Sequence, residues 1–361
     1  MLLTHTYFNI DTAAPASPET SVLLIYTGGT VGMAYDEGRT LVPMKFTSIL
    51  QNIPELRQFR MRLTVLSLAT PIDSSNVSPA TWLTLLDIIA REYDAYDGFV
   101  VLHGTDTMAY SASALSFLLE HLTKPVIFTG AQVPIGRIRT DARENLLTAL
   151  ELAAARHAGA NVARVPEVSI FFHNVLLRGN RAKKVESSHF NAFKSENHPP
   201  LVRAGIDLDY NEAAIRRTVP GRATQFHRRL DDRVVVLKLF PGITERVVRS
   251  MLAADELRGC VLETYGSGNA PTAPWFVRAL RDALDGGLHI LNVSQCDEGR
   301  VQQGRYETSA QLRDLGIIGG DDITTEAAIT KLMFVLGQGH DADTTRRLLA
   351  SGLRGEITHG G

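Results

Sequence analysis

The sequence predicts an α/β protein of two domains, a larger N-terminal domain on a parallel sheet and a smaller C-terminal α/β domain. Short apolar runs alternate with segments of helical periodicity, which is typical of a parallel sheet covered by helices on both faces. Many of these runs end in glycine-containing or polar turns. The length of 361 residues also exceeds one ordinary domain, so two are expected.

The elements of the N-terminal half follow from these runs. Buried strands are expected at 22–26, 63–68, 99–102, 125–128 and 168–172. Ser78 as the N-cap and Pro79 at the first helical position predict the start of a helix after the second strand. Asp141 and Glu144 fit a capping box that opens a later helix.

The domain boundary is expected in a polar stretch. We expect an N-terminal catalytic domain at 1–207, a linker at 208–233 and a C-terminal domain at 234–361. The linker contains six arginines, which could contact RNA or simply face solvent. No aromatic platform on which bases could stack accompanies them, so a solvated linker is the favoured interpretation. Elements expected in the C-terminal domain are strands at 234–240, 259–264 and 288–293 and helices at 324–336 and 343–351.

Composition narrows the class of protein. Hydrophobic residues make up 44%, charged residues 21%, and the net charge is −2, so neither nucleic acid nor a membrane surface is an expected partner. Two cysteines, Cys260 and Cys296, are too few for a disulfide framework or a zinc site. The start lacks the pattern of a secretory signal, and no apolar run is long enough to span a bilayer. We therefore expect a cytoplasmic protein.

Reactive side chains gather at the expected strand ends. Thr30 follows the first strand and the turn at Gly28–Gly29, and Thr105 follows the third strand. In open α/β sheets ligands bind at the carboxyl edge of the strands, where both threonines would lie. A hydroxyl is a weak nucleophile that needs a proton relay, which Asp106 and Lys184 could provide. Taken alone, the first turn also fits a plain tight turn with Thr30 as a strand cap.

Other polar groups of these turns suit binding. Asp106 could pair with a substrate ammonium and Ser74 with a carboxylate, while backbone N–H groups of the glycine turns could stabilise an oxyanion. His103, His121 and His173 lack the spacing of metal ligands, so neither a metal nor a cofactor is expected. We expect His103 to be a structural residue that forms hydrogen bonds.

Two stretches together carry a resemblance. Thr27–Met33 and His103–Met108 resemble the two signatures of the bacterial-type L-asparaginases. The similarity continues at 73–75, 129–132, 178–181, 265–271 and 316–320, and so covers about 21 to 355. The stretch 265–271 and the missing signal sequence resemble the cytosolic type I branch. The resemblance implies hydrolysis of L-asparagine to L-aspartate and ammonia without a cofactor, by a homodimer or a dimer of dimers with sites near a subunit boundary.

The resemblance also implies roles for individual residues. Thr30 would be the nucleophile that forms an acyl-enzyme, and Thr105, Asp106 and Lys184 would form a second catalytic set. Lys184 is preferred to Lys183 because it lies five residues after Gly179. The residues implied in substrate binding are Gly29, Asp73, Ser74, Ser75, Gly104, Thr105, Asp106 and Asn269. Ser74 and Ser75 would grip the substrate α-carboxylate, Asp106 would meet its α-amino group, and Asn269 would reach the pocket of the partner subunit.

The chain departs from the family pattern in two places. The stretch 38–43 lacks the tyrosine that helps to activate the first threonine in many relatives, and Tyr35 is out of register, so the activation of Thr30 is left open. Glu263 stands where some type I enzymes have an arginine that binds a regulatory asparagine, so we do not expect that regulation. Glu307 could supply a carboxylate across the subunit boundary or be a plain surface residue.

Two other functions remain open at this stage. One is the ammonia-releasing subunit of a tRNA-dependent amidotransferase, which carries an extra N-terminal domain, whereas only about twenty residues precede the first expected strand here. The other is a non-catalytic amino-acid sensor, suggested by the missing lid tyrosine. Selectivity between asparagine and glutamine also stays open, because one methylene is worth only ~1–3 kcal/mol.

Overall fold

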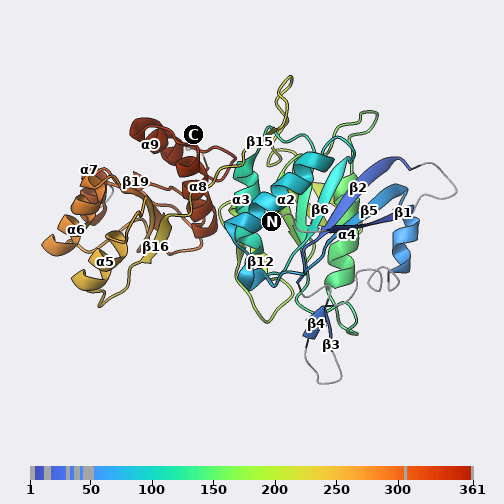
Figure 1. The fold of residues 1–361 in the computed structure, drawn as a ribbon, viewed down its shortest axis with the longest axis horizontal. Coiled ribbons are helices and arrows are strands. Elements are labelled where there is room, and N and C mark those ends of the chain that lie inside the picture. Colours follow the sequence, from blue (N-terminus) through green and yellow to red (C-terminus); the bar gives the residue numbers. More distant parts are fainter. Residues whose placement is uncertain are drawn as a thin grey trace. The chain divides into compact units, whose positions relative to one another are not determined.

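The computed structural model describes residues 5–11, 18–29, 33–35, 41–43, 53–304 and 307–358 (Figure 1). The chain forms two compact units. The first comprises residues 1–195 and 199–226, and the second comprises 196–198 and 227–361. Both units are α/β, as the sequence predicts.

A nine-stranded sheet is the centre of the first unit, with the strand order β1-β5-β2-β6-β8-β9-β10-β13-β14. Its strands are β1 (His5–Asp11), β2 (Thr20–Tyr26), β5 (Met61–Leu68), β6 (Gly98–Leu102), β8 (Val126–Thr129), β9 (Val168–Phe172), β10 (Val175–Arg178), β13 (Val202–Ala204) and β14 (Leu208–Tyr210). The five central strands, from β5 to β9, run parallel. The remaining strands pair antiparallel at the two ends.

The purely parallel sheet expected from the sequence is therefore a mixed one. β10 returns directly from β9 through His173 and Asn174, whose φ angles of 45° and 67° make a tight hairpin turn. A hairpin needs only a few residues, whereas a parallel connection needs a helix-length crossover, and none separates these two strands. The polar stretch expected as a linker also contributes to this end of the sheet, because β14 lies within it.

Short elements complete the first unit. The helices are η2 (Pro54–Gln58), η3 (Ser74–Asn76), α2 (Pro79–Glu92), α3 (Met108–Leu118), α4 (Ala142–Ala154) and η4 (Gly179–Arg181). The short strand pairs are β3 (Met33–Tyr35) with β4 (Leu41–Pro43), β7 (Leu119–Glu120) with β15 (Gln225–Phe226), and β11 (Lys183–Lys184) with β12 (Phe193–Lys194).

Helices cover both faces of the large sheet. Helix α4 packs on the face that includes Val22, Leu24 and Val100, all fully buried. Side chains alternate between faces along a strand, so Phe99 points to the opposite face, where it stacks on Tyr93 at the end of α2 at a centroid distance of 5.9 Å. The core therefore lies in two layers around the sheet.

Of two helix starts predicted from the sequence, one has the predicted cap and the other does not. Helix α2 begins at Pro79 with Ser78 as its N-cap, as predicted. At α4 the predicted capping box does not form, because the Asp141 carboxylate accepts from the side-chain amide of Asn145 at 3.3 Å but from no backbone N–H of its own helix end. Its two oxygens accept instead from backbone N–H groups of the preceding loop. Gln132 N–H donates to Oδ2 at 3.0 Å, and Val133 N–H donates to Oδ1 at 3.0 Å. A carboxylate satisfies more donors on the neighbouring loop than on its own helix.

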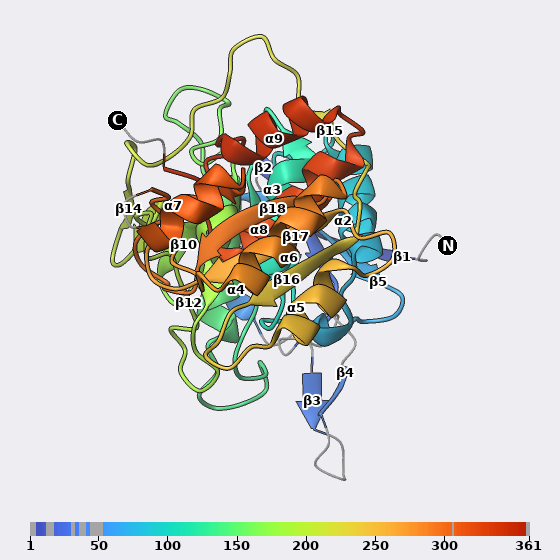
Figure 2. The same ribbon diagram turned by 90° about the vertical axis from the view of Figure 1, so that its left-hand side faces the viewer.

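The second unit is a smaller four-stranded parallel sheet (Figure 2). Its elements are β16 (Val234–Lys238), α5 (Glu245–Leu252), β17 (Gly259–Thr264), α6 (Pro274–Asp285), β18 (His289–Ser294), α7 (Glu307–Asp314), β19 (Ile318–Gly319), α8 (Thr325–Gly337) and α9 (Ala342–Ala350). Helices α5 and α6 pack on the face of Leu237, Leu262 and Ile290.

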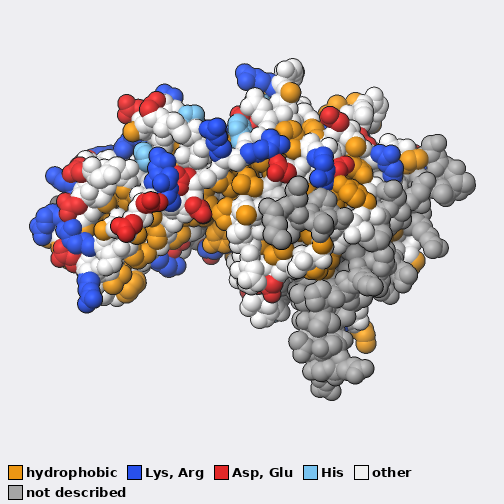
Figure 3. Space-filling view, viewed as in Figure 1, with side chains coloured by type: hydrophobic (Ala, Val, Ile, Leu, Met, Phe, Trp, Pro, Cys, Tyr) orange, Lys and Arg blue, Asp and Glu red, His pale blue; other side chains and the backbone are white. Residues whose placement is uncertain are grey.

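One face of the molecule can be inspected for the distribution of charged side chains. On the face drawn in Figure 3, acidic and basic side chains are interspersed across both units. No helix in the described ranges has the length and apolar character needed to cross a bilayer.

Candidate active site

Three loops meet at the carboxyl edge of the parallel strands, and glycines let them do so. Gly28 and Gly29, after β2, have φ angles of 130° and 88°, a region that favours glycine. A Cβ atom on Gly29 would lie 2.6 Å from the backbone nitrogen of Gly104, after β6. A Cβ atom on Gly104 would in turn lie 2.6 Å from Oγ of Ser74, after β5. The turn after β2 thus packs backbone against backbone on the turn after β6, and the turn after β6 packs on the Ser74 side chain of the turn after β5.

The loop that carries the expected nucleophile is anchored at its start. The Thr27 hydroxyl donates to the carbonyl of Leu102 at 2.8 Å, and the Thr27 backbone N–H donates to the same oxygen at 3.1 Å. The Thr27 carbonyl accepts from the backbone N–H of Ile72 at 2.7 Å. Thr30 itself lies outside the described residues, as do the lid stretch 36–40 and the side chain of Tyr35.

The structure brings together the three residues of the expected second catalytic set. Lys184 Nζ donates to Oγ1 of Thr105 at 2.8 Å and to Oδ1 of Asp106 at 2.6 Å. Thr105 is 7% exposed and the side chain of Lys184 17%, whereas the side chain of Asp106 is 66% exposed. The lysine therefore holds a shielded hydroxyl beside a carboxylate that is open to a ligand. Lys183, which the sequence interpretation set aside, pairs with Lys194 in the β11–β12 ladder.

Gln132 also belongs to the site. It lies in the family-like stretch 129–132, but no role was predicted for it from the sequence. Its Oε1 accepts from the Thr105 hydroxyl at 3.2 Å, and its Nε2 donates to the carbonyls of His189 and Glu186 at 3.2 and 3.4 Å. Because the Lys184 ammonium can only donate, the proton of Thr105 points to Gln132. Sequence spacing alone does not predict this contact, because Gln132 and Thr105 follow different strands and meet only in the folded sheet.

The turn after β5 holds the residues expected to bind a substrate carboxylate. Asp73 Oδ1 accepts from the backbone N–H and hydroxyl of Ser75, at 2.9 and 2.8 Å, and these bonds lower the pKa of the Asp73 carboxyl. The Thr107 hydroxyl donates to the Ser74 carbonyl at 2.7 Å and ties this turn to the Thr105 loop. The Ser74 hydroxyl lies against Gly104 and has no partner among the described residues.

A buried chain of hydrogen bonds supports the Thr105 loop from below. Trp82 Nε1 donates to Ser111 Oγ at 3.0 Å, Ser111 Oγ lies 2.9 Å from His103 Nε2, and His103 Nδ1 lies 2.7 Å from the carbonyl oxygen of Gly104. A carbonyl oxygen only accepts, so the proton sits on Nδ1 and Nε2 accepts from Ser111. Burial lowers the pKa of His103 to about 4, which keeps the ring neutral. His103 thus has the structural role expected from the sequence.

Asn269 and Glu263 lie in the second unit. The turn that contains Asn269 is closed by reciprocal backbone hydrogen bonds of 2.9 Å between Tyr265 and Asn269. The Glu263 carboxylate accepts from the Thr325 hydroxyl at 2.5 Å and lies 3.4 Å from Lys238 Nζ. These partners already occupy the carboxylate that stands in place of the effector-binding arginine. The side chain of Glu307 is outside the described residues.

In the described part of the chain, no group of three or more His, Cys, Asp or Glu residues is placed to hold a metal ion. The arrangement at the carboxyl edge instead offers hydroxyls, an ammonium, a carboxylate and backbone donors within one set of loops. Such groups can bind a zwitterionic amino acid and transfer protons at an acyl centre.

Comparisons with known proteins agree with this fold. Residues 21–216 match the family described as "Asparaginase, N-terminal", and 233–349 match "Glutaminase/Asparaginase C-terminal domain". The chain therefore belongs to the asparaginase family. It is 41% identical to "L-asparaginase 1" of Escherichia coli K12, over 94% of this chain and 98% of that protein. The crystal structure of L-asparaginase I from Vibrio cholerae superimposes with a TM-score of 0.84 at 37% identity, covering 94% and 99% of the two chains.

A second relative is longer. The chain is 41% identical to the "60 kDa lysophospholipase" of Mus musculus over 96% of its own length, but it spans only 64% of that protein. The shared part is therefore the asparaginase-type region, and that relative has a further third of its length that has no counterpart in this alignment.

Proposed function

We propose that the protein hydrolyses L-asparagine to L-aspartate and ammonia without a cofactor. The observation that carries the proposal is the position of Lys184 Nζ, which lies 2.8 Å from Thr105 Oγ1 and 2.6 Å from Asp106 Oδ1. A mixed set of hydroxyl, ammonium and carboxylate beside glycine turns suits amide hydrolysis through a hydroxyl nucleophile. The name of the E. coli relative supports the same reaction.

Thr30 is the proposed nucleophile on the strength of its motif. With Lys184 as the neutral amine, the Thr30 oxygen attacks the side-chain amide carbon, Thr30 gives its proton to Thr105, and Thr105 gives its own proton to Lys184 Nζ. The C–N bond then breaks, ammonia leaves with a proton, and an ester to Thr30 remains. Water hydrolyses the ester and returns the proton to the threonine. Asp106 orients Lys184 and, through its exposed face, meets the substrate α-ammonium.

Gln132 is proposed as a positioning residue for this relay. It accepts the Thr105 proton in the resting state, when Lys184 donates to the same hydroxyl. When Lys184 is the neutral amine, the Thr105 proton turns from Gln132 to Nζ, and Thr105 can then accept the proton of the nucleophile as it gives up its own. Gln132 also ties this hydroxyl to the backbone of the segment that follows Lys184, at Glu186 and His189.

The substrate carboxylate is proposed to bind at the turn after β5. The Ser74 hydroxyl has no hydrogen-bond partner in the described part of the chain, and the Ser75 hydroxyl is held by Asp73. Gly29 and Gly104 supply backbone N–H groups to the same place. We further propose a cytoplasmic homodimer or dimer of dimers in which Asn269 reaches the site of the partner subunit.

Ammonia release by the purified protein tests this function. L-asparagine and L-glutamine are compared with Thr30→Ala as the control, and a lysophospholipid substrate is assayed in parallel. Release from asparagine that is lost in the variant supports both the reaction and the nucleophile. A folded protein that releases ammonia from neither amide would favour the sensor. Release only with ATP and charged tRNA in a complex would favour the amidotransferase.

A further inference from the structure

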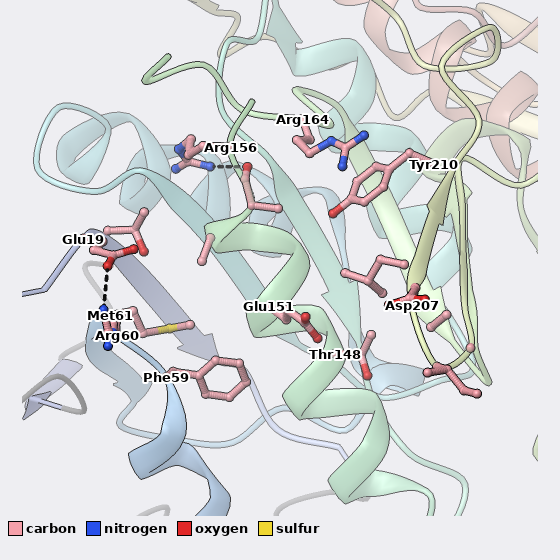
Figure 4. Close-up of a pocket in the computed structure, with 17 residues that line it drawn as sticks. Glu19, Phe59, Arg60, Met61, Thr148, Glu151, Arg156, Arg164, Asp207 and Tyr210 are labelled. Atoms are coloured by element: carbon pink, nitrogen blue, oxygen red, sulfur yellow. Dashed lines mark hydrogen bonds and ion pairs between the residues drawn. The ribbon is translucent and has the colours of Figure 1, made fainter. Parts of the chain in front are cut away.

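A pocket of about 600 Å³ lies in the first unit, away from the loops described above (Figure 4). Its lining includes Thr20 and Met61, the first residues of the parallel strands β2 and β5. It therefore opens at the amino edge of the sheet, roughly 20 Å from the carboxyl edge for strands of this length. Its size falls within the range of small-molecule sites.

Helix α4 forms the floor of this pocket. In Figure 4 Phe59 and Met61 lie on one side of the helix, and Tyr210 lies on the other with its hydroxyl directed towards the helix. Thr148 and Glu151 are three residues apart on α4 and so share one face of it. Apolar surface and polar groups thus line one cavity.

The basic residues of the pocket are already engaged. Arg164 bonds Glu212 at 2.7 Å, and its guanidinium stacks over the Tyr210 ring at 3.5 Å. Arg156 donates to backbone carbonyls, including that of Ala155 at 2.9 Å. The third arginine of the lining, Arg60, lies 3.4 Å from the Glu19 carboxylate. None of these three is a free cation for an anionic ligand.

Three acceptors of the pocket are unused. Among the described residues, the Glu151 carboxylate and the hydroxyls of Thr148 and Tyr210 have no hydrogen-bond partner. Burial raises the pKa of Glu151, as expected of a carboxylate that lacks a compensating donor. Burial also raises the pKa of Tyr210, and the nearby charge of Glu151 adds to that rise while Arg164 opposes it. Glu151, Thr148 and Tyr210 all line the same pocket.

We propose that this pocket binds a primary amine in its ammonium form, held by Glu151, Thr148 and Tyr210. An ammonium has three N–H donors and no acceptor, so it can bond the Glu151 carboxylate, which only accepts, and the hydroxyl oxygens of Thr148 and Tyr210, which can accept. The ammonium forms a charge-assisted hydrogen bond with Glu151. The apolar part of the amine packs over Phe59 and Met61. The pocket thus recognises an organic cation with an apolar body.

Isothermal titration calorimetry on the full chain tests the proposal with n-hexylamine as the probe. The neutral 1-hexanol and the anionic hexanoate are the matched ligands. We expect saturable binding of hexylamine at one per chain and binding of the other two at least about tenfold weaker, because a hydrogen bond to a charged group contributes about 1.5–3 kcal/mol. The measurement contains no asparagine, so its outcome is independent of the proposed enzymatic function.

Two variants on the same helix separate the pocket from general charge effects. Glu151→Gln should weaken hexylamine binding at least about tenfold. Glu144→Gln makes the same change on α4 outside the pocket, where the side chain is exposed as that of Glu151 is, and should bind as the unaltered protein does. Equal binding of 1-hexanol, unchanged affinity in a folded Glu151→Gln variant, or no saturable heat at millimolar amine would each overturn the proposal.

Discussion

The two edges of the large sheet are built in opposite ways. At the carboxyl edge, loops pack backbone against backbone at Gly29 and Gly104, and the hydroxyl of Thr105 both accepts and donates a hydrogen bond. At the amino edge, a wide pocket leaves the polar groups of Glu151 and Tyr210 without partners among the described residues. The first edge is preorganised for chemistry, since its groups are fixed before a substrate arrives. The second has the open acceptors of a binding site.

Substitution of Gly104 tests whether the close packing of the loops at the carboxyl edge is required. Gly104→Ala would place a Cβ atom 2.6 Å from Ser74 Oγ and 2.7 Å from Ser74 Cβ. Because the loop must shift, we expect kcat/KM to fall at least about 100-fold and stability to fall by about 1–3 kcal/mol. Gly136→Ala is the control, as nothing lies within 4 Å of its Cβ position. Equal kinetics in the two variants would show that close packing of the loops is not required.

Gln132 tests whether the orientation of one hydroxyl matters at this edge. Gln132→Met keeps the volume of the side chain and removes the acceptor that holds the Thr105 proton. We expect kcat to fall about tenfold, the worth of about one hydrogen bond, while KM stays within about twofold. Steady-state kinetics with L-asparagine measure both constants. A rise in KM at constant kcat would place Gln132 in substrate binding instead.

The buried support beneath the Thr105 loop predicts a pH dependence of stability. The pKa of His103 is lowered from 6.5 to about 4 in the folded protein. The unfolded chain therefore binds more protons between these values, and stability that is present above pH 6.5 is lost as the pH falls towards 4. The loss amounts to roughly 3 kcal/mol at most.

Urea unfolding at pH 7 and pH 4.5 checks this dependence in the unaltered protein and in His103→Gln. The difference in unfolding free energy between the two pH values should be smaller in the variant, because it lacks the titrating ring. An equal difference in both proteins would mean that other groups cause the acid sensitivity.

Much of the carboxyl edge could be predicted from the sequence, because its residues directly follow the predicted strands. Each buried run ends at the same edge of a parallel sheet, so Ser74 and Thr105 come together once the strands pair in register. The N-cap at Ser78 is equally local and was predicted correctly. Lys184 required the family pattern, because its own strand is only two residues long.

The remaining features depend on contacts between distant segments. The antiparallel end of the sheet arises from a hairpin at His173–Asn174, and no strand was predicted from the sequence directly after 168–172. Asp141 accepts from backbone N–H groups of a neighbouring loop rather than from those of its own helix, which no local capping rule can show. The amino-edge pocket joins Phe59, Glu151 and Tyr210, which lie far apart along the chain.

The central claim is that Lys184 drives proton transfer at the carboxyl edge, and a pair of adjacent lysines tests it most directly. Ammonia release from L-asparagine is measured for Lys184→Met and Lys183→Met, with folding confirmed by thermal unfolding. We expect kcat to fall by about 100-fold or more in Lys184→Met, the usual worth of a positioned acid or base, and to change little in Lys183→Met. Full activity of a folded Lys184→Met variant, or equal losses in both, would contradict the account.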